Sequence, residues 1–104
     1  MANGEIRPQA LIGTWKKIGA AACAAKYPET INFSTGTYRG TRGVGQGLIS
    51  WDAGIYRIEG PKTLVVGTAS DELVRYDITL RGDRLDITDG DGCRFSYERQ
   101  TSDG

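Results

Sequence analysis

Apolar and polar residues alternate over many short segments, and this alternation constrains the fold of the chain more than any other feature. In residues 72–80, Val74 and Tyr76 fall on one face of an extended chain, and charged residues fall on the other. Residues 83–88 and 93–99 repeat the pattern, with glycine-containing turns between segments. The pattern predicts antiparallel strands that each turn one face toward a common core.

The spacing of these segments predicts an all-β fold. The expected strands are residues 11–18, 29–34, 36–41, 47–52, 54–59, 63–68, 72–80, 83–88 and 93–99. Segments 47–52 and 54–59 alternatively form one bent strand with a bulge. Consecutive hairpins remove their edges by closing, so we predict a single up-and-down antiparallel β-barrel of eight to nine strands. The alanine-rich residues 19–30 predict a short helix or loop after the first strand.

Length and charge limit the organisation and the partners of the chain. A chain of 104 residues is long enough for one domain. We expect a flexible N-terminal arm at 1–10, the barrel at 11–99 and a flexible tail at 100–104. Thirteen basic residues balance thirteen acidic ones, so we predict neither a nucleic-acid nor a membrane partner. No apolar run resembles a signal peptide or a bilayer span, which predicts a cytoplasmic location.

The chain contains no histidine, which removes the commonest general base and metal ligand. Triads built on serine or cysteine with histidine are therefore excluded, and we predict no metal and no cofactor. Lys17 is the one catalytic candidate, because its parity with Trp15 points it inward. Desolvation there would lower the pKa of the amine and make it a base or a Schiff-base nucleophile. Alternatively, the strand ends or bulges and Lys17 reaches solvent.

Five stretches of the chain follow one another in a familiar order: LIGTWKK, INFSTGTYRG, GIYRIEGPKTLVV, YDITLRGDRLDIT and CRFSYERQ. Together they resemble the bacterial lipocalin-like proteins of the calycin group over about residues 11–99. The resemblance implies a closed barrel in which an arginine of the last strand packs over the first-strand tryptophan. Arg99 is the positional candidate for this arginine, and Arg94 is the alternative.

The first strand also has a physical interpretation that is independent of the resemblance. Gly13 allows a sharp bend and the close approach of another backbone. Trp15 then points inward and closes one end of the barrel with a large apolar surface. We therefore assign Gly13, Trp15 and Arg99 to barrel closure.

Aromatic residues dominate the predicted barrel interior, which is too bulky for a long lipid chain. The candidate ligand-binding residues are Tyr38, Tyr56, Tyr76, Tyr97, Phe33 and Phe95. Their rings would form apolar walls, and the tyrosine hydroxyls would orient a small hydrophobic or aromatic molecule. Alternatively, the tyrosines are core residues with their hydroxyls at the rim.

Three further features concern the barrel ends and its outer surface. Cys23 and Cys93 fall at the same mouth of a closed barrel, so one disulfide is allowed, although a reducing cytosol would keep thiols. The glycine-rich run 39–47 predicts a flexible loop at the barrel mouth. Ile49, Ile55 and Val65 predict an outer apolar patch and hence a homodimer.

Three functions are compatible with these features. The first is the binding of a small hydrophobic molecule inside the barrel, without chemistry. The second is a cofactor-independent cyclase or isomerase that acts on a natural-product-like substrate, with Lys17 and inward tyrosines as acid–base groups. The third is a protein-interaction or inhibitor barrel with a packed interior. A packed interior favours the third function over the other two.

Overall fold

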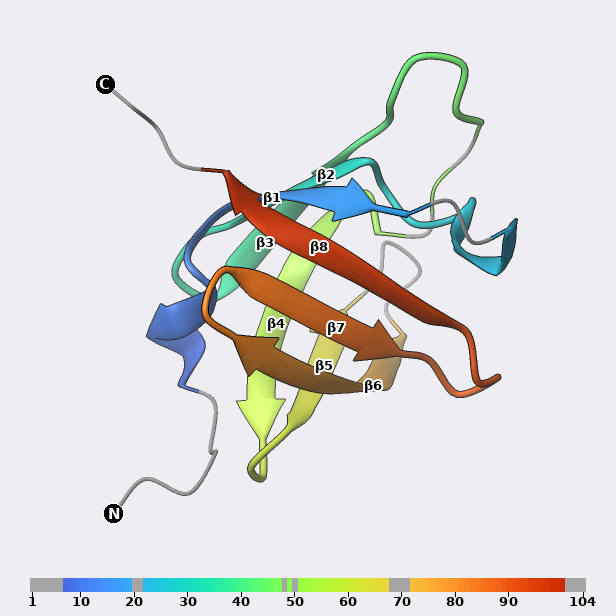
Figure 1. The fold of residues 1–104 in the computed structure, drawn as a ribbon. Helices are drawn as coiled ribbons and strands as arrows, with labels where there is room; N and C mark the ends of the chain where they lie inside the picture. Colours follow the sequence, from blue (N-terminus) through green and yellow to red (C-terminus); the bar gives the residue numbers. More distant parts are fainter. Residues whose placement is uncertain (1–6, 20–21, 48, 50, 68–71, 101–104) are drawn as a thin grey trace.

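The computed structural model describes residues 7–19, 22–47, 49, 51–67 and 72–100, and these form a closed antiparallel barrel (Figure 1). Its strands are β1 (Gly13–Ile18), β2 (Thr30–Phe33), β3 (Thr37–Thr41), β4 (Ala53–Glu59), β5 (Thr63–Gly67), β6 (Leu73–Arg81), β7 (Arg84–Thr88) and β8 (Arg94–Gln100). Each strand pairs with its neighbours in sequence, and β1 pairs with β8 to close the sheet. The prediction of an all-β up-and-down barrel is therefore confirmed, with eight strands.

The prediction of a strand over residues 47–52 is wrong for the part that the structure describes. Gly47, Ile49, Trp51 and Asp52 have no strand conformation, while positions 48 and 50 lie outside the described residues. Trp51 is instead fully buried in the core, and the backbone N–H of Gly40 donates to the carbonyl of Asp52 at 2.8 Å. Trp51 therefore turns inward from an irregular segment and not from a strand.

Two 3₁₀ helices lie at opposite ends of the barrel (Figure 1). The first, η1 (Pro8–Leu11), includes residues that the sequence analysis places in the N-terminal arm, and it carries the fully buried Leu11. The second, η2 (Ala22–Ala24), is the predicted short helix after the first strand. Among the described residues, no helix is long and apolar enough to cross a membrane.

The three residues predicted for barrel closure lie together at the η1 end of the barrel. Trp15 is fully buried, and its Nε1–H donates to the carbonyl of Leu11 at 2.9 Å. The Arg99 guanidinium lies 4.4 Å from the indole centroid, a cation–π distance, because β1–β8 register places these residues opposite each other. Gly13 has a φ of 137°, and an added Cβ there would lie 3.1 Å from the guanidinium. Arg94 lies on the outer face instead, so Arg99 is the closing arginine.

The interior core consists of side chains from all eight strands. Alternation along the predicted strands points sixteen apolar or aromatic side chains inward: Trp15, Ile31, Phe33, Tyr38, Tyr56, Ile58, Leu64, Val66, Val74, Tyr76, Ile78, Leu80, Leu85, Ile87, Phe95 and Tyr97. Thirteen of them belong to the buried cluster, and Ile58, Val74 and Leu80 are partly buried against it. Period-two alternation therefore identifies the inward face of every strand. The core also contains Leu11, Ala24, Tyr27, Trp51 and Cys93, which lie outside the strands.

The prediction of an outer apolar patch is wrong for Val65, which is not exposed. Val65 is almost fully buried, although it does not belong to the interior cluster. Its cross-strand neighbours are Arg57 and Arg75, and both guanidinium groups bind the carboxylate of Glu59. Long arginine side chains thus flank Val65 on both sides. Ile55 keeps an exposed fraction of 55%.

Candidate functional site

The hydroxyl groups of the four predicted ligand-binding tyrosines form hydrogen bonds to other groups of the protein. The hydroxyls of Tyr38, Tyr56 and Tyr97 donate to backbone carbonyls at 2.9, 2.6 and 2.6 Å. The hydroxyl of Tyr76 accepts from the indole N–H of Trp51 at 3.1 Å. Burial raises the pKa of Tyr38 to about 12, so its hydroxyl stays protonated at neutral pH. These hydrogen bonds connect strands and loops of the barrel.

The aromatic rings pack against one another across the interior. The ring of Phe33 contacts that of Tyr56 at 4.8 Å between centroids, and Phe95 contacts Tyr97 at 6.0 Å. Tyr27 stacks on Phe95 with a centroid distance of 4.0 Å and an interplanar angle of 13°. Such pairs contribute about 0.5–1.5 kcal/mol each beyond the area they bury. The predicted ligand-binding rings thus form one aromatic core.

Sequence reasoning missed Tyr27 and Trp51, which lie at the η2 end of this core. Their ring centroids are 5.8 Å apart, and both rings also contact Tyr76. Neither residue lies in a strand, so alternation carried no signal for the direction of their side chains. The size of the two rings was the only available indication of burial.

Asp89 is a third residue without a predicted role, and it organises the turn before β8. Its carboxylate accepts from the Tyr27 hydroxyl at 2.8 Å and from the backbone N–H groups of Asp91 and Cys93 at 2.9 Å each. Burial opposes ionisation, but these hydrogen bonds outweigh it and lower the pKa of Asp89. Its oxygens are thus occupied by protein donors. The described residues contain no group of three or more potential metal ligands.

Lys17 lies beneath the segment formed by residues 22–28, which we name the cover segment. Its ammonium donates to the carbonyls of Ala24 and Tyr27, both at 2.9 Å. Desolvation lowers the pKa of Lys17, and the negative charge of Glu29 opposes the shift. Both hydrogen bonds go to backbone carbonyls, so the contacts of the amine fasten the cover segment to β1.

Cys23 and Cys93 form a disulfide in the structure, with their Cα atoms 5.9 Å apart. The bond joins η2 to the residue before β8, as expected if both cysteines lie at one mouth of the barrel. It is a second attachment of the cover segment, next to the Lys17 hydrogen bonds.

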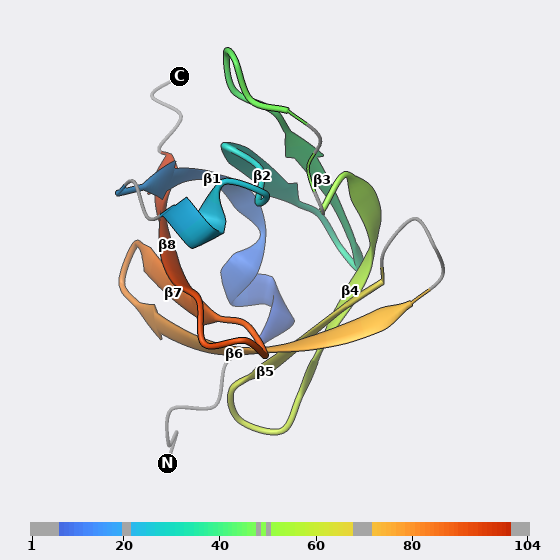
Figure 2. The same cartoon turned by 90° about the vertical axis from the view of Figure 1, so that its right-hand side faces the viewer.

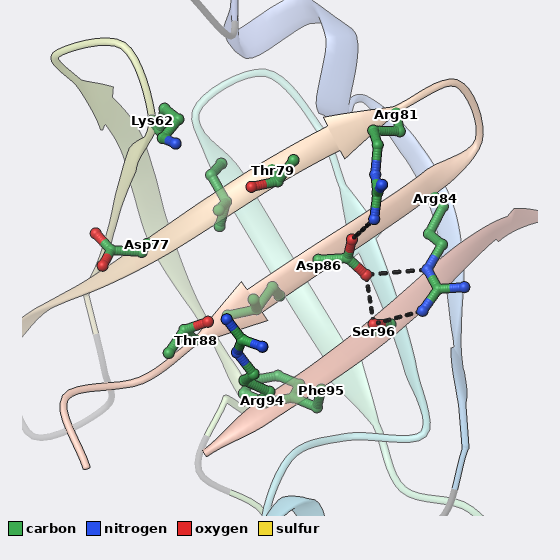
Figure 3. A pocket seen from close by; sticks show the side chains of 12 residues that line it. Lys62, Asp77, Thr79, Arg81, Arg84, Asp86, Thr88, Arg94, Phe95 and Ser96 are labelled. Atoms are coloured by element: carbon green, nitrogen blue, oxygen red, sulfur yellow. Dashed lines mark hydrogen bonds and ion pairs between the residues drawn. The ribbon is translucent and has the colours of Figure 1, made fainter. Parts of the chain in front are cut away.

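A broad hollow of about 780 Å³ lies on the outer face of β6, β7 and β8, and we name it the outer hollow (Figure 3). Its charged groups are Lys62, Asp77, Arg81, Arg84, Asp86 and Arg94. At one end, Asp86 forms ion pairs with Arg81 at 2.9 Å and with Arg84 at 3.0 Å. Ser96 donates a further hydrogen bond to the same carboxylate. At this end the protein therefore pairs both guanidinium groups with one carboxylate.

The other end of the outer hollow contains cations that the protein leaves unpaired. Neither Arg94 nor Lys62 forms a side-chain hydrogen bond or ion pair with another described residue. Arg94 shares a cross-strand row with Thr88 and Asp77, and no ion pair joins it to that aspartate (Figure 3). The hollow therefore carries four cationic and two anionic groups on a chain whose overall net charge is zero.

We expect the Asp86 network to make stability depend on pH in the acid range. Partial burial disfavours the carboxylate, but hydrogen bonds from Ser96 and two guanidinium groups outweigh it and lower the pKa of Asp86 from 3.8 to about 2. This contribution to stability is complete above pH 3.8 and is lost as the pH falls through 2. Thermal unfolding between pH 5 and pH 2 should show a steeper loss for the wild type than for Asp86→Asn.

Asp91→Asn is the matched control, because the Asp91 side chain bonds to no other described residue. It should retain the wild-type slope. Equal slopes for the wild type and Asp86→Asn would contradict the assignment of this carboxylate.

Comparisons with protein-family models, with curated proteins and with solved structures find no match for this chain. The fold and the geometry of its surfaces therefore carry the functional argument.

Proposed function

We propose that this protein is a non-enzymatic interaction barrel that binds an acidic region of a partner protein through the outer hollow. One observation carries the proposal: Arg94 and Lys62 at the hollow form no ion pair with another described residue, whereas the inward tyrosine hydroxyls bind backbone carbonyls. Charged groups without partners in the protein are available to a ligand of opposite charge.

The charge of the outer hollow favours a carboxylate-rich partner. Arg81 and Arg84 share the single carboxylate of Asp86, so this cluster retains a net positive charge. Arg94 and Lys62 add two further cations against Asp77. A surface with this excess attracts glutamate and aspartate side chains, and salt weakens the attraction.

The composition of the exposed surface favours protein over nucleic acid as the partner. The large apolar side chains exposed among the described residues are Ile12, Val44, Ile55 and Leu73, and none of them is aromatic. Single-stranded nucleic acids are bound mainly by aromatic stacking together with cationic grooves.

The other functional predictions stay predictions. A small molecule inside the barrel, a catalytic Lys17, membership of the calycin group, a bacterial source, a homodimer and a cytoplasmic location have no test in the structure. The Cys23–Cys93 disulfide favours an oxidising compartment over the cytoplasm.

Binding of labelled poly-L-glutamate, measured by fluorescence anisotropy at low salt, tests the proposal. We expect the double variant Arg94→Gln/Lys62→Gln to bind about tenfold more weakly than the wild type, since two cations are lost. The wild-type affinity should fall as salt rises from about 20 to 200 mM, because added salt shortens the Debye length and screens the exposed charges.

Arg39→Gln/Arg7→Gln is the matched control, because it also removes two exposed cations and both lie outside the outer hollow. It should bind like the wild type. An equal loss in both variants would mean that net charge alone drives binding and would overturn the proposal. Tighter binding of oligo-dT than of poly-L-glutamate would also overturn it.

A further inference from the structure

The loop after β3 carries one apolar side chain entirely in solvent. Val44 has an exposed fraction of 108%, the largest of any large apolar residue described. It occupies a β-turn over residues 43–46, which stands clear of the strands in Figure 2. The backbone N–H of Gln46 closes the turn on the carbonyl of Gly43 at 3.1 Å, and Gly45 supplies a φ of 77°. Exposed valines are common, so exposure alone does not define a site.

A second observation is that hydrogen bonds of the Gln46 side chain connect this turn to the rest of the protein. The Gln46 side chain accepts from the backbone N–H of Gly43 at 2.9 Å. Its amide group donates to the carbonyls of Ala25 and Tyr27 at 3.0 and 2.6 Å. The cover segment that receives these bonds is itself fixed by the disulfide and by Lys17. These bonds connect the described turn, which belongs to the loop predicted to be flexible, to the cover segment.

The third observation is the charge beside the turn. A hollow between the turn and β1 is lined by Lys16, Glu29, Arg42 and Val44. Lys16 and Arg42 form no ion pair with another described residue. Lys17 lines both this hollow and a second hollow between η2 and β8. Arg94 lines both that second hollow and the outer hollow. The cationic surface thus continues from the outer hollow to the turn.

We propose that the 43–46 turn is a pre-positioned apolar contact for an acidic partner segment that carries one large apolar side chain. That side chain packs on Val44, and its neighbouring carboxylates bind Lys16 and Arg42. Because the turn is already ordered, binding does not have to restrict its backbone. The inference rests on the proposed function and adds an apolar requirement to it.

Two synthetic octapeptides test this inference. Both consist of alternating Glu and Gly residues, and they differ only at one central position, which is leucine in the first peptide and serine in the second. We expect the leucine peptide to bind the wild type about tenfold more tightly, the effect of burying one aliphatic contact. Val44→Ser should remove this difference while leaving the serine peptide unchanged. Ile55→Ser is the matched control, because Ile55 is also exposed but lies away from the turn, and it should keep the difference.

The possible outcomes separate this inference from the proposed function. Equal binding of the two peptides, together with Arg94- and Lys62-dependent binding of poly-L-glutamate, would overturn the role of the turn and leave the proposed function standing. A leucine preference that Val44→Ser removes, without any effect of Arg94→Gln/Lys62→Gln on poly-L-glutamate, would support the turn and overturn the role of the outer hollow. A preference that also disappears in Ile55→Ser would overturn the inference.

Discussion

Replacement of Trp15 by alanine is expected to lower the free energy of unfolding by about 3–5 kcal/mol, the usual effect of deleting a buried tryptophan. The indole is fully buried, donates to the Leu11 carbonyl and lies under the Arg99 guanidinium. Alanine would leave a cavity at the η1 end and remove all of these interactions. Urea unfolding followed by circular dichroism measures the change, since it does not depend on the lost indole fluorescence.

Two further variants separate the contributions of Trp15. Trp15→Phe keeps a ring beneath Arg99 and loses the N–H donor, so it should cost less than the alanine variant. Ile55→Ala removes an exposed aliphatic side chain of β4 and should change stability by no more than about 0.5 kcal/mol. A cost below about 1 kcal/mol for Trp15→Ala would contradict the closure role of the residue.

The closed end of the barrel was predictable because its residues lie in regular strands. Alternation fixes Trp15 on the inward face of β1, and closure of the sheet places β8 beside β1. The choice between Arg99 and Arg94 depends on register, which pairs Trp15 with Arg99. A shift of one residue would turn the pairing to the other face, so the sequence could only rank the two arginines.

The η2 end was less predictable because its residues lie in irregular segments. Tyr27 and Trp51 have no periodic neighbours that would indicate which way their side chains point. Asp89 resembles a solvated turn residue, and only the fold brings the Tyr27 hydroxyl to it across 62 positions of sequence. Such contacts depend on the path of loops, which local pattern does not determine.

The candidate site was predictable in its residue types but not in their partners. Alternation places the tyrosine rings inward, yet whether a hydroxyl faces a ligand or a backbone carbonyl depends on atoms far away in the chain. Tyr97, for example, donates to the carbonyl of Pro28. On the outer face, composition does not distinguish Arg84, which pairs with Asp86, from Arg94, which pairs with no other described residue. Side-chain pairing of this kind follows from three-dimensional geometry.

The Cys23–Cys93 disulfide is expected to contribute about 4 kcal/mol, because it joins residues 70 positions apart and restricts the unfolded chain. The double variant Cys23→Ser/Cys93→Ser should therefore unfold at a clearly lower urea concentration than the oxidised wild type. Reductant should shift the wild type toward the double variant and leave the double variant unchanged. Electrophoretic mobility under non-reducing conditions reports the oxidation state of each sample.

The double variant should still form the barrel, because the disulfide is only one of several attachments of the cover segment. Lys17 holds the carbonyls of Ala24 and Tyr27, and Gln46 holds that of Tyr27 as well. Near-native circular dichroism combined with a lower unfolding midpoint is thus the expected result. Loss of the folded state in the variant would mean that these hydrogen bonds form only after the disulfide. An unchanged midpoint in reductant would instead contradict the stabilising role of the disulfide.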